Sequence, residues 1–220
     1  MSSPIIQLLV LAGIAIFLIL RLRDVLGTRE GYEKPKMARP DDGGRIKGPD
    51  LQVIEGGADA DITDHADPMS SVGKALIAMK AADASFNVTE FLGGARGAYE
   101  MILMAFEAGE MAKIQPFLSG EVYESFASVV SDREEKGLTI QAKFVGVREM
   151  KLVGAEFDRD SSEGEVSVRF VGELTSVVRD KGGDIVEGNP DEVKRQKDVW
   201  TFARVMGSDN PNWSLVATGG

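Results

Sequence analysis

The spacing of apolar residues changes once along the chain, near Gly137. Upstream of this glycine, from about residue 68, apolar side chains recur every three or four positions, which is the spacing of amphipathic helices. Gly137 itself suits the end of a helix, because glycine tolerates positive φ. The predicted helices run over 72–86, from Val88 to near Gly109 with Asn87 and Glu90 as a capping pair, and from Ser119 toward Gly137.

Downstream of Gly137 apolar and polar residues alternate, which is the pattern of strands with one buried face. Alternating segments begin at Leu138, Val166 and Val199, and a short last segment covers 213–217. Turn-forming sequences rich in Asp, Asn and Gly separate the later segments. Helices followed by four or five antiparallel strands predict an α+β fold, with the helices packed on a curved sheet.

The first twenty residues show a third pattern, a nearly unbroken apolar run. Residues 4–20 contain no charged side chain and approach the roughly 20 residues that a bilayer-spanning helix needs. No basic side chain precedes the run and no small-residue cleavage site follows it, so an uncleaved transmembrane anchor over 1–26 is expected rather than a signal peptide. The residues expected to face lipid are Ile5, Leu8, Leu9, Leu11, Ile14, Ile16, Phe17, Leu18 and Leu20.

The charges that flank this run predict its orientation. Residues 21–40 hold six basic side chains, of which Arg21 and Arg23 are placed to contact lipid head groups, whereas residues 1–10 hold none. The positive-inside rule then places the C-terminal bulk on the cytoplasmic side of the membrane. Glycine, proline and charged residues dominate 27–67, which predicts a flexible linker between the anchor and a domain over 68–220.

The composition limits the kinds of catalytic and metal-binding site that the chain can form. The chain has no cysteine, which excludes thiol nucleophiles and thiolate metal sites. It has a single histidine, His65, so a histidine-based triad could use only this residue. The net charge of −10 argues against nucleic acid as the main partner. No catalytic arrangement of even moderate specificity is recognisable, and we expect a protein that is not an enzyme and that has no cofactor or metal.

Two local motifs resemble ligand sites, and each has a plainer interpretation. An acidic cluster ends the predicted linker; it comprises Asp59, Asp61, Asp64, His65 and Asp67. The ligand order of a calcium loop is missing, which favours a solvated acidic linker over a divalent-ion site. The segment GGARG at 93–97 lacks the order of a phosphate-binding loop and lies within a helical pattern, so we interpret it as small residues that pack closely on a neighbouring element.

Two apolar surfaces are candidates for binding. The first predicted helix presents an apolar face that either contacts a membrane or partner protein or packs into the core. The residues of this face are Val72, Leu76, Met79 and Phe86. The concave side of the sheet is a candidate pocket for a lipid chain or another small apolar ligand. The residues predicted to line this pocket are Phe144, Phe170, Trp200 and Phe202.

Two ordered stretches of this sequence resemble a known family. The first is FLGGARGAYEMILMAFEAGEMAKIQPFLSGEVYESF at 91–126, and the second is DVWTFARVMGSDNPNWSLVAT at 198–218. In their order and separation they are similar to the C-terminal domain of the Tim44-like family, which comprises the mitochondrial inner-membrane import-motor tether and its bacterial relatives. The resemblance covers most of residues 68–218.

The resemblance implies an NTF2/cystatin-like fold of helices on a curved sheet, without known catalytic residues. In mitochondria the tether binds the translocation channel and recruits the Hsp70 chaperone, and its early domain helices, here roughly 72–86, are implicated in cardiolipin contact. This sequence has the apolar run and a short linker in place of the chaperone-binding region, so Hsp70 recruitment is not implied.

These observations together predict a role for the chain. We expect an adaptor or scaffold at the bacterial inner membrane, in protein transport or membrane-complex assembly. The alternative is a module that binds a lipid or small apolar ligand. The sequence leaves the identity of a protein partner and the oligomeric state open.

Overall fold

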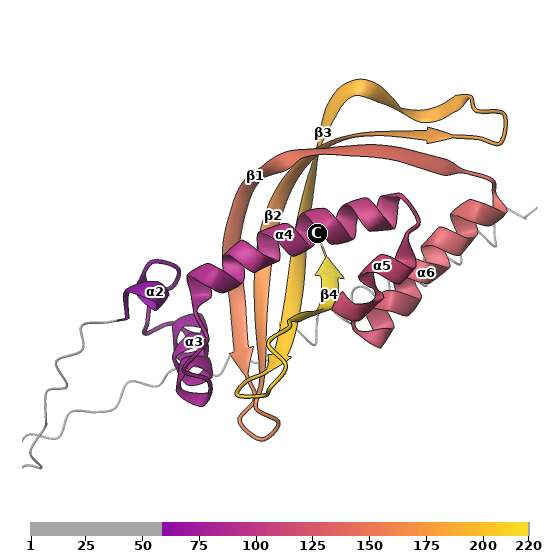
Figure 1. Ribbon diagram of the computed structural model, residues 1–220. Coiled ribbons are helices and arrows are strands. Elements are labelled where there is room, and N and C mark those ends of the chain that lie inside the picture. The colour runs from indigo at the N-terminus through magenta and orange to yellow at the C-terminus, as the bar shows by residue number, and fades with distance from the viewer. Residues whose placement is uncertain (1–58, 220) are drawn as a thin grey trace, which may run out of the picture. The chain divides into compact units, whose positions relative to one another are not determined.

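The computed structural model describes residues 59–219 (Figure 1). The predicted anchor, including Arg21 and Arg23, and most of the predicted linker lie outside the described residues. Among the helices of the described part, none is long and apolar enough to cross a bilayer.

Helices precede strands, as the sequence pattern predicts. The helices are α2 (Ala60–Thr63), α3 (Ser71–Ala82), α4 (Val88–Glu107), α5 (Met111–Ile114), the 3-10 helix η1 (Gln115–Phe117) and α6 (Gly120–Glu135). The strands are β1 (Thr139–Phe157), β2 (Glu163–Arg179), β3 (Ile185–Val205) and β4 (Ser214–Gly219). They form one antiparallel sheet in the order β1-β2-β3-β4, which confirms the α+β fold class.

Side-chain caps fix where the long helices begin. The Ser70 hydroxyl accepts the N–H of Gly73 at 3.0 Å, and Asn87 Oδ1 accepts the N–H of Glu90 at 2.8 Å. Such caps satisfy backbone donors that the first turn of a helix leaves unpaired. The predicted helix over 72–86 is too long at its C-terminal end, because Asp83 starts a turn by accepting hydrogen bonds from Ser85.

The sheet is strongly bent, and the helices lie on its concave side (Figure 1). The pairing of β1 with β2 shifts register at three points, between residues 144 and 146, 147 and 149, and 152 and 154. Each shift is a bulge that lets a long strand bend. The core therefore forms between α4 and the inner sheet face, where Val166, Val168 and Phe170 of β2 are fully buried.

Tyr99 is the residue through which α4 is fixed to the sheet. Its fully buried ring stacks on Phe170, with centroids 4.4 Å apart, and tilts against Trp200 at 4.8 Å. The hydroxyl donates a hydrogen bond to Asp198 Oδ2 at 2.6 Å. Burial, and then the bond to Asp198, raise the pKa of Tyr99, so the hydroxyl stays a neutral donor. A Cβ at Gly172 would lie 2.7 Å from the hydroxyl oxygen, so only glycine fits beneath the ring.

The folded domain begins earlier than the boundary predicted at residue 68. Ile62 of α2 is 2% exposed and belongs to the core. The Asp61 carboxylate accepts the N–H groups of Val88 and Thr89 at 2.8 and 2.9 Å, which caps α4 from outside that helix. It also pairs with Lys80 at 2.9 Å, and Asp59 pairs with the same lysine at 2.6 Å. We call this set of contacts the Asp61 clasp.

The clasp corrects the interpretation of the acidic cluster as a solvated linker. Asp59 and Asp61 are structural ion-pair partners, and His65 Nε2 lies 3.2 Å from the Thr89 hydroxyl. Within the described residues, Asp64 is the one member of this cluster that is exposed and makes no side-chain hydrogen bond, as expected of a linker residue. Across residues 59–219, no three His, Cys, Asp or Glu side chains lie close enough together to hold a metal ion.

Burial would raise the pKa of Asp61, but hydrogen bonds from Lys80, Val88 and Thr89 outweigh it and lower the pKa to about 2. The ordinary value is 3.8, so the carboxylate binds protons less readily in the folded chain than in the unfolded one. Its stabilising contribution is therefore complete above pH 4 or so and is lost as the pH falls toward 2.

We predict that Asp61→Asn lowers the free energy of unfolding at neutral pH by about 1–3 kcal/mol, because the variant loses charged hydrogen bonds to α4 and Lys80. Urea denaturation measures this, and the difference from the parent chain should shrink in acid as the parent loses the same contribution. Asp64→Asn, an exposed neighbour, is the control and should change stability by no more than about 0.5 kcal/mol. Equal effects of the two substitutions would contradict the clasp.

Candidate functional site

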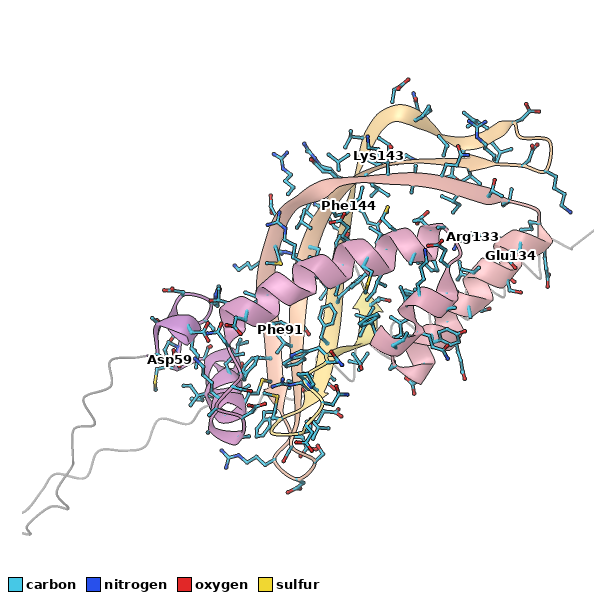
Figure 2. All side chains as sticks on the ribbon, in the orientation of Figure 1. Asp59, Phe91, Arg133, Glu134, Lys143 and Phe144 are labelled. Carbon is cyan, nitrogen blue, oxygen red and sulfur yellow. The ribbon has the colours of Figure 1, made fainter. Side chains whose placement is uncertain are left out.

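An apolar groove of about 530 Å³ opens beside the first half of α4. The end of β3, the loop that follows it and η1 form the other walls. The aromatic residues that line the groove are Phe86, Phe91, Phe117, Phe202 and Trp213. Phe91, which is labelled in Figure 2, packs against Trp213 at 4.6 Å and Phe202 at 5.9 Å between ring centroids. These ring contacts hold the walls in place, which is a property of preformed ligand sites.

Glycines form the α4 wall of this groove. Gly94 and Gly97 line it, and a Cβ at either position would meet no atom within 4 Å. Gly93 is equally open. This corrects the interpretation that the GGARG segment packs closely on a neighbouring element. Glycine inside a helix lowers the stability of the helix by roughly 1 kcal/mol relative to alanine, so these residues weaken α4. They also leave one face of α4 without side chains, which leaves space for the groove.

The polar end of the groove carries a partly buried ion pair. Arg204 Nη2 contacts Asp83 Oδ2 at 2.6 Å, and both side chains are 10% exposed. The hydrogen bond from the Ser85 hydroxyl, with those from the N–H groups of Gly207 and Ser85 and the charge of Arg204, lowers the pKa of Asp83 despite its burial. The guanidinium lies 5.2 Å from the centroid of the Trp213 ring, a cation–π contact. An apolar ligand in the groove would therefore meet a fixed cation at one end.

A second hollow of about 780 Å³ lies between the other half of α4 and the beginning of β1. Glu100, Glu107, Lys143 and Phe144 are among its lining residues. Burial raises the pKa of Glu107, and the charge of Arg133 opposes that rise. Lys143 and Phe144 lie on the strand that passes over α4 in Figure 2.

The four aromatic residues predicted to line one pocket do not share a cavity. Phe202 lines the groove, and Phe144 lines the second hollow. Phe170 and Trp200 instead pack against Tyr99 in the core. The alternation of the sequence placed all four correctly on the inner sheet face, but it carried no signal that a tyrosine from α4 fills the space between them. Phe91, Phe117 and Trp213 were missed, and Phe86 was assigned to another surface, because the groove combines side chains from different elements.

The predicted binding face of the first helix is part of the core. Leu76 and Met79 are fully buried, Phe86 is 4% exposed and Val72 is half-buried. The prediction that these residues form a membrane or partner surface is therefore wrong. Val72, Leu76 and Met79 lie on the inner side of α3, where Met79 reaches Gly164 of β2, so the plainer interpretation of a core-facing helix holds. Phe86 lies beyond the end of α3 and lines the groove.

The fold and the groove together define an α+β domain whose concave side holds an aromatic-lined groove. The family model described as the Tim44-like domain matches residues 72–220, and the chain belongs to this family. This confirms the resemblance seen in the sequence.

Human mitochondrial import inner membrane translocase subunit TIM44 is a relative, 26% identical over 118 residues. The match covers 52% of this chain and 25% of the human protein, so the chain spans about a quarter of the length of that relative. Among solved structures, the intermembrane space region of the chloroplast protein ARC6 is similar with a TM-score of 0.40 and 11% identity, over 58% of this chain and 94% of that one. Similarity at this level says nothing about function.

We predict that Gly94→Ala and Gly97→Ala each raise the free energy of unfolding, by about 0.5–1 kcal/mol, because alanine favours the helix and meets no neighbour. Denaturant titration measures the change. Gly172→Ala is the contrasting control, since its Cβ would collide with Tyr99, and it should destabilise the chain by more than about 1 kcal/mol. Destabilisation by the two groove substitutions would show that α4 packs more tightly there than described.

Proposed function

We propose that the chain is a membrane-anchored, non-enzymatic adaptor or scaffold in protein transport or membrane-complex assembly. Its domain lies on the cytoplasmic side of the bacterial inner membrane. The observation that carries the proposal is the Tim44-like domain over 72–220, in the same chain as the uncharged apolar run at 4–20. The relative named as an inner-membrane translocase subunit supports a role beside a membrane, and the helices on a bent sheet suit an NTF2/cystatin-like scaffold.

The proposed mechanism is confinement. A linker over 27–58 would keep the domain within reach of the membrane, so weak contacts gain from an effective concentration that reaches about the millimolar range for short linkers. The Asp61 clasp gives this linker a fixed end, because residues 59–67 are held on α3 and α4.

We predict that removal of residues 1–58 releases the domain into the soluble fraction and lowers recovery of cross-linked partners from cells by about tenfold or more. The cut is placed before Asp59 because a cut at 68 would also remove the clasp. Replacing residues 1–26 by an unrelated single-span anchor of the same orientation is the control, and it should restore recovery. Unchanged partner capture after removal of 1–58 would contradict confinement as the mechanism.

The groove supports a second function, binding of a lipid chain or another small apolar ligand. The specific observation is its size and lining, about 530 Å³ with five aromatic residues and the Arg204 cation at one end. Because Asp83 already balances the charge of Arg204, this end suits a ligand with a neutral polar head, such as a carbonyl, and a hydrocarbon tail.

We predict that residues 59–220, purified without added lipid, carry an apolar ligand visible by native mass spectrometry. Gly97→Leu should lower the ligand-bound fraction several-fold, since its side chain enters open space in the groove. Glu121→Leu, an exposed change on α6, is the matched control. A ligand-free parent chain would favour the adaptor alone.

A further inference from the structure

One edge of the sheet is open over part of β3. β2 pairs with β3 down to Ile185, whereas β4 pairs only with Val199–Ala203 on the other side. Within the described residues, no strand lies against β3 between Ile185 and Asp198 on that side. Every second residue of an antiparallel edge directs its backbone N–H and C=O outward, so this stretch offers unpaired hydrogen-bonding groups.

The usable part of this edge is short and has two clear ends. At one end β4 stops opposite Val199. At the other, the β2–β3 register shifts between Lys194 and Asn189, so residues 190–193 are looped out of the regular ladder. Bulges of this kind interrupt pairing along an edge. The open window is therefore 194–198, directly in line with the end of β4.

Basic side chains predominate in this window, and its one acidic residue, Asp198, is occupied by the hydrogen bond from Tyr99. Lys194 and Lys197 are exposed, and within residues 59–219 neither forms an ion pair with an acidic side chain. Arg195 forms an ion pair with Glu173 at 2.9 Å, and Glu173 also pairs with Arg148 at 3.4 Å. Two arginines therefore share one carboxylate, and the three side chains together keep a net positive charge. The site is a local basic region on a chain of net charge −10.

The basic region continues onto the outer face of the sheet. Register places Lys197 beside Val171 of β2, next to Arg169, and Arg169 opposite Lys151 of β1. The same face also carries Glu149, opposite Val171, so cations outnumber carboxylates there without being alone. A basic stripe of this kind attracts an acidic partner at long range and repels a basic one.

A second copy of this chain is a poor occupant of the window. In each antiparallel pairing centred on 195, 196 or 197, Arg195 or Lys197 of one copy falls opposite Arg195 or Lys197 of the other. Like charges directly opposite each other are destabilising. An acidic segment meets no such penalty, because carboxylates at every second position fall on the face that carries Arg195 and Lys197.

We propose that the β3 window 194–198 binds an extended acidic segment of a partner protein, which adds to the sheet as a strand in line with β4. Main-chain hydrogen bonds supply part of the affinity, and the cations select the partner and fix its register. The window would supply the partner-binding half of the adaptor proposed above. It does not depend on the membrane anchor, so the two proposals fail separately.

The test uses the full chain in detergent and a fluorescein-labelled peptide of alternating glutamate and threonine. Fluorescence anisotropy measures binding, and hydrogen exchange measures protection of the backbone amides at 194–198. The variant is Lys194→Glu with Lys197→Glu, which reverses one charge on each face of the strand. The matched control is Lys74→Glu with Lys113→Glu, which makes the same charge change at exposed positions on α3 and α5.

We expect the peptide to bind, to protect the window, and to bind about tenfold more weakly to the Lys194/Lys197 variant, a loss of about 1.4 kcal/mol, while the control variant binds as the parent does. A peptide with lysine in place of glutamate should not bind. The proposal is overturned if the acidic peptide does not bind, if both variants weaken binding equally, or if the protected amides lie elsewhere. Protection of the window by phosphatidylglycerol vesicles but not by the peptide would make it a lipid contact instead and would also overturn the proposal.

Discussion

The stack of Tyr99 on Phe170, above Gly172, is the contact on which the arrangement of this domain depends. It fixes the middle of a twenty-residue helix to the middle of a bent sheet, with the hydroxyl satisfied by Asp198. The concave side is consequently closed at its centre. The aromatic groove remains on one side of Tyr99, and the hollow lined by Glu100 and Glu107 remains on the other.

The domain has three candidate functional surfaces, and none of the residues named for one belongs to another. The Asp61 clasp determines where the preceding chain enters, the groove faces η1 and the β3–β4 loop, and the open β3 window lies beyond the end of β4. Their charges also differ, because Asp and Glu outnumber Lys and Arg on the helices whereas the window is basic. A scaffold that is tethered, carries an apolar ligand and holds an acidic segment would need no overlap among these surfaces.

The sequence predicted those features that depend on local spacing. The capping residue Asn87, the helix start at Ser119, the change of period at Gly137 and the inner-facing aromatics of the strands are all signals within a few residues of each other. Prediction from the sequence failed for features formed by segments that are far apart in the chain. Nothing near Asp61 indicates that its carboxylate caps a helix that starts at Val88, and nothing in GGARG distinguishes a packed glycine face from an open one. The groove was missed for the same reason, because its walls combine residues from the α3–α4 loop, α4, η1, the end of β3 and the β3–β4 loop.

The central claim is that the chain is held in a membrane with its domain on the cytoplasmic side. Alkaline carbonate extraction of membranes from cells that produce the full chain, combined with protease added to intact spheroplasts, tests it most directly. The account predicts that the protein stays in the membrane pellet and that the domain resists the protease until the spheroplasts are opened. Release of the intact chain into the carbonate supernatant, or digestion of the domain from outside, would contradict it.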